Sequence, residues 1–365
     1  MKSLSAKGHT YLIGITDKYL FFRYLGIIKR SVLTFEKTII LQRKLYIHLL
    51  SLVIIFSALW FYLTVPFYAL QFHSAKGFFI ANNIHGAVLK IAAVFYAVYQ
   101  FILIHKAKGS SKLEQLLLAI RNKKIQSNNW KDIRYTIVKL FFIPLMLPPA
   151  IIYFNLFLDL LQSTEEYSSF ILLFNKYIFS LIIYGVSFIT LAYYAFGYLI
   201  ESKKLNSTVK SVDNTFFGWV VLAICYVPFF VFFTYYIPFP TQDYAFFINQ
   251  EITFLVRILL SLLMLFKMYS VVNLGAKCSN LTNRGIVTKG PYQYIRHPHY
   301  LAKLLIWWIT FLPYLIHHYW AIGAMVFWSV VYFLRALTEE IHLSKDVDYK
   351  TYKQQVKWMF IPYVV

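Results

Sequence analysis

The chain has 365 residues, of which 59% are hydrophobic, 20% are aromatic and only 14% are charged. Soluble globular domains carry about 25% charged residues, so this composition excludes an ordinary soluble enzyme and is typical of a multi-pass membrane protein. The formal net charge of +21 does not indicate nucleic-acid binding, because Lys and Arg cluster in alternate loops, as the positive-inside rule describes for membrane proteins.

Residues 1–44 are rich in basic and aromatic residues and lack the apolar segment and cleavage site of a signal peptide. They predict a cytoplasmic extension that either lies on the anionic membrane surface as an amphipathic helix or is solvated. Residues 45–273 then predict six transmembrane helices, the third kinked by its three prolines. These helices are expected near residues 45–70, 84–105, 136–161, 170–200, 216–237 and 252–274.

Two shorter apolar segments, 301–316 and 321–337, lie in the C-terminal region, residues 274–365. Each is close to the lower limit of about 17 residues for crossing a bilayer, so they predict a thin or partly crossing hairpin. The whole sequence therefore predicts an all-α fold with about eight transmembrane helices. Lys and Arg are frequent in alternate loops, which predicts that both termini lie on the cytoplasmic side of the membrane. That membrane is expected to be a bacterial inner membrane or the endoplasmic reticulum.

Ionisable residues flank the C-terminal hairpin on both sides. The stretch T-K-G-P-Y-Q-Y-I-R-H-P-H-Y, residues 288–300, precedes the hairpin, and R-A-L-T-E-E, residues 335–340, ends it. Because both ends of a hairpin return to the same side of the membrane, we expect these residues to form one polar site at the cytoplasmic surface. Arg335 and Glu339 are one helical turn apart, so a simple ion pair on the helix surface is the alternative.

This two-part pattern resembles the isoprenylcysteine carboxyl methyltransferase family, which belongs to a wider group with the phospholipid N-methyltransferases. The resemblance rests on G-P-Y-x-Y-x-R-H-P-x-Y, then R-x-x-x-E-E, Y-x-x-Y and a terminal I-P, within residues 274–362. It implies methyl transfer from S-adenosylmethionine to a lipid-borne or hydrophobic acceptor, such as a carboxylate of the isoprenylcysteine type. The expected partners are the bilayer and a membrane lipid or lipidated acceptor; no obligate protein partner can be inferred.

The resemblance also implies roles for individual residues around a cofactor that the hairpin and tail enclose. Glu340 would bind the methionine ammonium, with Glu339 as a second candidate, and Arg335 and Glu339 would form the catalytic site beside the acceptor. Tyr349 and Tyr352 would pack the tail over the cofactor. The other predicted cofactor-binding residues are Gly290, Pro291, Tyr292, Arg296, His297, Pro298 and Tyr300.

Three other functions remain open at this point. A phospholipid N-methyltransferase would share the cofactor but have an amine acceptor, and an NADPH-dependent sterol or enone reductase shares the R-H-P-x-Y segment. The paired glutamates disfavour a 2′-phosphate, and a transporter or channel would carry more ionisable residues at mid-membrane than this sequence does. No metal site is predicted, because His297 and His299 lack a third ligand in register.

Two lysines near this region have no settled role. Lys303 stands where the family commonly has a smaller residue, and it would narrow or charge the mouth of an acceptor tunnel. Lys267, about two turns from the inner end of its span, either snorkels to the interface or contacts an anionic head group.

Overall fold

The computed structural model describes residues 127–163, 165–226, 229–237 and 246–363, together with residues 38–53 and a few positions between 35 and 122. The chain divides into two compact units, residues 1–56 with 87–124, and residues 57–86 with 125–365. In the first unit residues 38–53 are helical. Most of the basic extension and of the two spans predicted near 45–70 and 84–105 lies outside the described residues.

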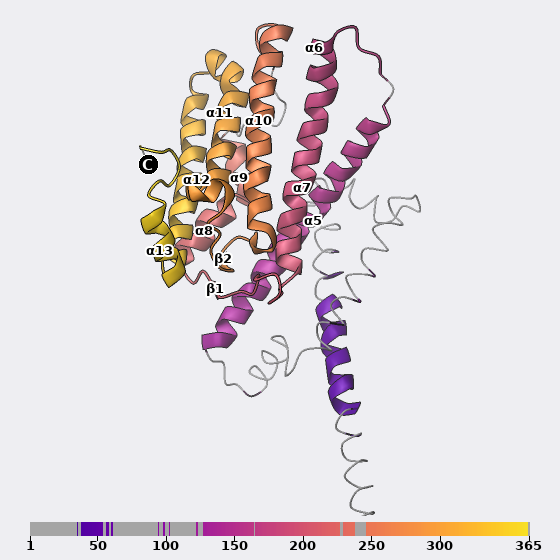
Figure 1. Cartoon of the computed structure of the whole chain (residues 1–365), viewed down its shortest axis with the longest axis vertical. Coiled ribbons are helices and arrows are strands. Elements are labelled where there is room, and N and C mark those ends of the chain that lie inside the picture. The colour runs from indigo at the N-terminus through magenta and orange to yellow at the C-terminus, as the bar shows by residue number, and fades with distance from the viewer. Residues whose placement is uncertain are drawn as a thin grey trace, which may run out of the picture. The chain divides into compact units, whose positions relative to one another are not determined.

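The described part of the second unit is almost entirely helical (Figure 1). Helix α5 packs against α7, α7 against α10, α10 against α11, and α12 packs against both α11 and α8. The three helices α10, α11 and α12 run side by side (Figure 1). In chain order the helical elements are α5 (Ser127–Leu161), α6 (Phe170–Leu173), the π-helical turn η1 (Phe174–Ile178), α7 (Phe179–Leu199), α8 (Phe216–Ile224), α9 (Phe229–Tyr236), α10 (Gln250–Leu274), the 3₁₀ turns η2 (Gly275–Lys277) and η3 (Gly290–Gln293), α11 (Pro298–His317), α12 (Ala321–Leu343) and α13 (Val347–Gln355).

Five of the described helical segments are long and apolar enough to cross a membrane. A sixth follows only if α8 and α9 count as one span. The helical, multi-pass character predicted from the sequence is therefore confirmed, whereas the total of eight crossings and the orientation of the termini stay predictions. The five segments are Asn129–Leu161, Phe170–Leu199, Gln250–Lys277, Pro298–His317 and Ala321–Leu343.

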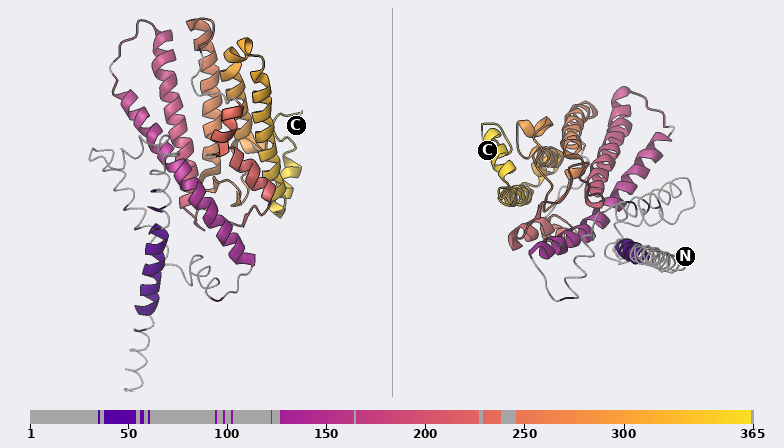
Figure 2. Two further views of the ribbon diagram at one scale, coloured as in Figure 1. Left: turned by 180° about the vertical axis from the view of Figure 1, so that it is seen from behind. Right: turned by 60° about the horizontal axis from the view of Figure 1, so that its bottom comes forward.

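The span predicted over 216–237 is not one straight helix. Two helices, α8 and α9, replace it and are bent by 59° relative to each other, and Figure 2 shows them from behind. In the sequence Pro228 lies directly before α9, and proline cannot donate the backbone hydrogen bond that would continue a helix. By contrast, α5 continues as one helix through the prolines that were expected to kink it.

The C-terminal hairpin is longer than its apolar segments predicted. Helices α11 and α12 have 20 and 23 residues, and at about 1.5 Å per residue each can cross about 30 Å of hydrocarbon. The apolar pattern underestimated α12 because its last two turns carry charged residues. Those turns hold Arg335, Glu339 and Glu340.

One small sheet departs from the all-α prediction. Strand β1 (Ser211–Val212) pairs antiparallel with β2 (Thr282–Asn283), with Ser211 opposite Asn283. Two-residue strands have no hydrophobic periodicity, so no sequence pattern could have indicated them. The pair joins the loop after α7 to the loop after α10, directly before the predicted site.

The orientation of the bundle can be tested by labelling single cysteines. We expect Thr288→Cys, in the basic loop before α11, to react only from the cytoplasmic side, and Tyr319→Cys, between α11 and α12, only from the opposite side. The measurement is labelling by a membrane-impermeant maleimide in intact and permeabilised cells. Both variants need a background without Cys225 and Cys278, and labelling of both from one side would show that α11 and α12 do not each cross the membrane.

Candidate active site

The loop before α11 is paired with the C-terminal tail through the backbone. The amide of Arg296 donates to the carbonyl of Trp358 at 3.0 Å, and the amide of His297 donates to that of Met359 at 3.0 Å. The Arg296 guanidinium also donates to the carbonyl of Val356 at 2.8 Å. These hydrogen bonds therefore hold residues 296–297 against residues 356–359, although the two segments lie about sixty residues apart in the sequence.

Glu340 lies at the centre of a cluster of cations. Its Oε1 is 2.6 Å from Nε of Arg296 and 3.3 Å from Nε2 of His297, and its Oε2 is 2.6 Å from Nζ of Lys353. The side chains of Arg296 and Glu340 are only 7% and 5% exposed. Both carboxylate oxygens are thus occupied, and Glu340 is absent from the lining of the neighbouring cavity. This geometry disfavours the ammonium-binding role expected for Glu340.

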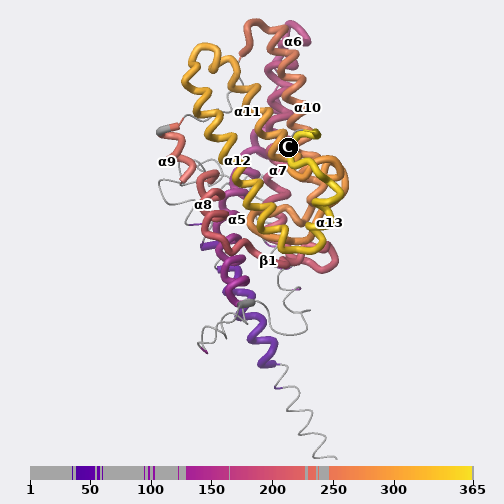
Figure 3. Tube along the Cα trace, turned by 90° about the vertical axis from the view of Figure 1, so that its left-hand side faces the viewer, coloured from indigo at the N-terminus to yellow at the C-terminus, as the bar shows by residue number. Residues whose placement is uncertain are grey.

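A cavity lies beside this cluster, bounded by the 274–300 loop, the end of α12 and α13. Helix α13 lies beside the lower part of α12 (Figures 1 and 3). Seven of the predicted site residues line the cavity, and five do not. The seven are Tyr292, Arg296, His297, Tyr300, Glu339, Tyr349 and Tyr352.

Three of the five that do not line it shape the backbone instead. Gly290 has φ +62°, and a Cβ at this position would lie 2.5 Å from the Asn273 side chain, so only glycine fits. Pro291 and Pro298 are buried at the first positions of η3 and α11, where the missing N–H has no helical partner to lose. The G-P and H-P dipeptides of the motif therefore fix the course of the chain around the cavity.

Glu339 is the carboxylate that faces this cavity. It is exposed, unlike its buried neighbour Glu340, and its Oε2 accepts a hydrogen bond from the Tyr300 hydroxyl at 2.9 Å. The adjacent wall is aromatic: Tyr352 donates to the carbonyl of Tyr292 at 2.7 Å, and burial raises the pKa of Tyr349 and keeps it neutral. The Tyr349 hydroxyl is buried without a hydrogen-bond partner among the described residues.

Several further residues line this cavity that the sequence did not predict, most of them in the 274–287 segment. Arg284 is 3% exposed, and its guanidinium donates to the carbonyls of Ile200 and Ser207 and to the Tyr135 hydroxyl. The signal that could have indicated it is the segment S-N-L-T-N-R-G, residues 279–285, because a run of small polar residues before a glycine is typical of a turn. The missed lining residues include Tyr194, Lys277, Asn280 and Arg284.

Arg335 lies away from this cavity and does not form the surface ion pair considered as its alternative role. It is 6% exposed, and its guanidinium donates to the Tyr226 hydroxyl at 3.2 Å and to Oδ1 of Asn280. Tyr226, Tyr300 and Tyr332 present their rings to it at 5.2, 5.4 and 5.7 Å. Among the described residues, no ion pair links Arg335 to Glu339.

Arg335 lines a second cavity, of about 320 Å³, that extends between α5, α7, α9, α10, α11 and α12. Tyr194, His299 and Tyr300 line both cavities, so the two adjoin at these side chains. One cavity faces the tail and the other lies among the apolar helices.

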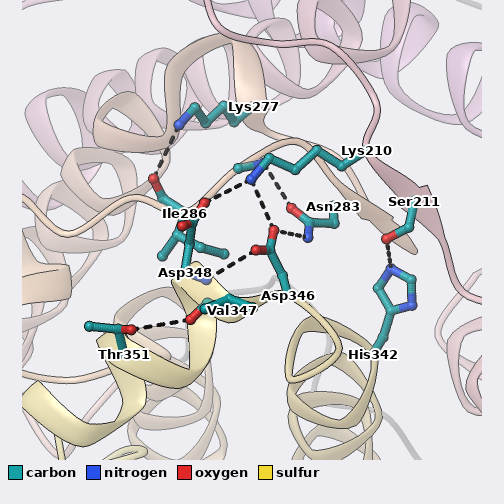
Figure 4. Close-up of polar contacts among 11 residues, drawn as sticks. Lys210, Ser211, Lys277, Asn283, Ile286, His342, Asp346, Val347, Asp348 and Thr351 are labelled. Atoms are coloured by element: carbon teal, nitrogen blue, oxygen red, sulfur yellow. Dashed lines mark hydrogen bonds and ion pairs between the residues drawn. The ribbon is translucent and has the colours of Figure 1, made fainter.

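A polar latch connects the small sheet to α13 (Figure 4). Lys210 lies 3.0 Å from Asp346 and 2.9 Å from Asp348, and Asn283 donates to Asp346 at 2.8 Å. Oγ of Ser211 lies 3.2 Å from Nε2 of His342, within hydrogen-bond distance. Asn283 also lines the first cavity, so these contacts hold one of its walls against the helix that carries Tyr349 and Tyr352.

The comparisons with known proteins agree with the motif at this site. Residues 251–350 match the model of the phospholipid methyltransferase family. This segment is a phospholipid methyltransferase domain. It contains α10, α11, α12, the 274–300 loop and the first turn of α13, so it includes most of the first cavity. Its membership of the wider phospholipid and isoprenylcysteine methyltransferase group confirms the resemblance, and it indicates a membrane methyltransferase. No curated protein and no solved structure is significantly similar to the chain.

Removing the Glu340 carboxylate tests its structural role. Glu340→Ala would leave the buried Arg296 guanidinium without its counter-ion, and breaking a buried pair costs about 3–5 kcal/mol. We therefore expect a large fall in the unfolding temperature of the purified full chain in detergent. The matched variant is Glu339→Ala, one residue away and exposed, which should lower that temperature only slightly. Equal effects of the two would refute the structural role.

The latch predicts a specific dependence of stability on pH. Burial disfavours the charged form of Asp346, but hydrogen bonds from Asn283, Lys210 and the Asp348 amide outweigh it, so the pKa of Asp346 is lowered. A lowered pKa stabilises the folded state above the ordinary aspartate pKa, and this contribution is lost as the pH falls below about 4. The unfolding temperatures of the wild type and of Asp346→Asn should therefore differ at pH 7 and converge at low pH.

Asp348→Asn is the control for the latch, because the Asp348 side chain is 67% exposed. It should change the unfolding temperature little at any pH. A difference between wild type and Asp346→Asn that stays constant from pH 7 to pH 3 would show that the carboxylate charge does not contribute.

Proposed function

We propose that the chain transfers a methyl group from S-adenosylmethionine to a hydrophobic or lipid-borne acceptor at the cytoplasmic side of a membrane. The observation that carries the proposal is the pair of adjoining cavities. One faces the C-terminal tail, and the other extends among helices that are long and apolar enough to span a membrane. A reaction between a water-soluble donor and a membrane-borne acceptor needs two such compartments that meet at one point.

The first cavity fits the donor by the chemistry of its walls. S-Adenosylmethionine carries an ammonium, a carboxylate, a sulfonium and an adenine base that a ribose links to the sulfonium. Glu339 offers an exposed carboxylate, Lys277 and His297 offer basic groups, and the tyrosines offer ring surfaces. The unpartnered Tyr349 hydroxyl supplies a hydrogen-bond donor or acceptor that nothing else in the described protein satisfies.

The residues act mainly by binding, orienting and excluding water. When bound, S-adenosylmethionine would supply an electrophilic methyl group, whose former bonding electrons stay on sulfur when the methyl passes to a nucleophile. Glu339 would hold the ammonium, with its own position fixed by the Tyr300 hydroxyl at 2.9 Å. Tyr300 and His299 stand where the cavities meet, so they would face both substrates. Positioning and desolvation supply most of the acceleration of such a displacement, which needs no metal.

Of the three other functions, the phospholipid N-methyltransferase keeps the same donor and differs only in the acceptor. The reductase would have to place a 2′-phosphate near Glu339, whose negative charge would repel it. The family match supports methyl transfer over both reduction and transport.

Binding of S-adenosylhomocysteine, the demethylated product, tests the donor site. We expect the purified chain to bind it with a Kd in the micromolar range, about −8 kcal/mol. Glu339→Gln should weaken binding by about 1–3 kcal/mol because a charge-assisted bond to the ammonium is lost. Tyr349→Phe should weaken it by about 0.5–1.5 kcal/mol without lowering stability, since its hydroxyl has no partner in the protein. Isothermal titration calorimetry measures both.

Two outcomes would redirect the proposal. If Glu340→Gln weakens binding while Glu339→Gln does not, the ammonium role belongs to Glu340 as the resemblance first implied. Tight binding of NADPH with no binding of S-adenosylhomocysteine would favour the reductase. Transfer of label from methyl-tritiated S-adenosylmethionine to a membrane lipid extract, absent in Glu339→Gln, would establish the reaction.

A further inference from the structure

The second cavity has an unbalanced charge. Three basic side chains line it, and none of the described lining residues is Asp or Glu. Charges inside a membrane protein are costly unless they are paired, and they mark functional positions. The three are Lys267 on α10, Lys303 on α11 and Arg335 on α12.

The contacts of these cations satisfy them only in part. Arg335 has two polar partners and three aromatic rings around it. Lys303 donates to the Tyr332 hydroxyl at 2.5 Å and lies 4.7 Å from the ring centre of Trp307. Lys267 makes no side-chain hydrogen bond or ion pair with any residue that the structure describes. Aromatic rings attract a cation but do not neutralise it, and no acid in the described lining balances these basic groups.

Three buried polar atoms in the same cavity also have no partner among the described residues. They are Oγ1 of Thr190, Oγ1 of Thr310 and Nδ1 of His299. Buried polar groups are usually hydrogen-bonded, and those that are not point to a missing ligand or water. Two hydroxyls and an imidazole nitrogen next to three cations form a set of groups that suits an anion with several oxygens.

The cavity continues from this charged end into an apolar passage. His299, Lys303, Ile306 and Thr310 lie on one face of α11, at helical spacing. His299 and Thr310 are eleven positions apart, or about 16 Å at 1.5 Å per residue. Met146, Phe230 and Met264 complete the apolar wall. The charged end adjoins the first cavity through His299, and the passage leads away from it.

We propose that the Lys267–Lys303–Arg335 cluster binds an anionic head group, a carboxylate or a phosphate, of an amphipathic molecule whose apolar chain lies along α11. The inference rests on the proposed function for the further claim that this molecule is the methyl acceptor. An anionic oxygen can accept the methyl group without losing a proton first, so no base is needed beside it. A cationic amine head group would instead be repelled by the three like charges.

The test is binding of matched amphiphiles with one chain length. Dodecanoate and dodecyl phosphate should raise the unfolding temperature of the purified full chain in neutral detergent. Their apparent affinities should exceed those of dodecanol and dodecylamine by about tenfold or more, as expected for charge-assisted hydrogen bonds. Lys303→Met and Lys267→Met should each remove most of this preference.

Three controls separate the possible explanations. Lys176→Met changes an exposed lysine of η1 that lines neither cavity, and it should keep the full preference for anionic amphiphiles. Sodium phosphate alone should stabilise the protein far less than dodecyl phosphate; equal stabilisation would make the site one for free anions and overturn the head-group inference. Equal or tighter binding of dodecylamine would overturn it as well.

Binding of S-adenosylhomocysteine to the same samples distinguishes this inference from the proposed function. If S-adenosylhomocysteine binds but the protein does not prefer anionic amphiphiles over dodecanol and dodecylamine, the inference fails while the donor site stands. If the anionic preference is present and depends on Lys303, but S-adenosylhomocysteine does not bind, the anion site stands and the methyltransferase proposal fails.

Discussion

The buried ion pair between Arg296 and Glu340 is the contact on which the C-terminal site depends, because it joins three parts of the chain. Arg296 precedes α11, Glu340 ends α12, and the carbonyl at Val356 that accepts from Arg296 begins the tail. A buried guanidinium must satisfy its donors, and a buried carboxylate must be paired. These requirements hold the tail against the loop and the loop against the hairpin, and the first cavity lies between them.

The two neighbouring glutamates of α12, Glu339 and Glu340, lie in different environments. Successive residues of a helix point about 100° apart, so Glu339 and Glu340 cannot share an environment. Glu340 turns toward three cations and is buried, whereas Glu339 turns toward the cavity and is exposed. A carboxylate already surrounded by cations has little attraction left for an ammonium, so this geometry favours Glu339 over Glu340 for the proposed ammonium contact.

One acidic side chain distinguishes the two cavities. Basic side chains line both, but only the described lining of the cavity that faces the tail also contains a carboxylate, that of Glu339. Tyr300 stands between them, with its hydroxyl on Glu339 and its ring 5.4 Å from the Arg335 guanidinium. Tyr300 therefore contacts both a carboxylate and a guanidinium at the point where the two cavities adjoin.

The sequence by itself determined the membrane helices of the described region to within a few residues at most ends, the C-terminal hairpin and the motif segments that form the site. The lengths of the apolar segments and the spacing of Gly, Pro, Arg and Glu can be read from the sequence, because they involve only residues close together in the chain. Only the tertiary structure decided which glutamate faces the cavity, that Arg284 and Asn280 belong to the site, and that Lys267 and Lys303 meet Arg335. Those outcomes depend on the rotation of each helix about its axis and on a two-residue strand pair, and both are set by packing between segments that are far apart in the sequence.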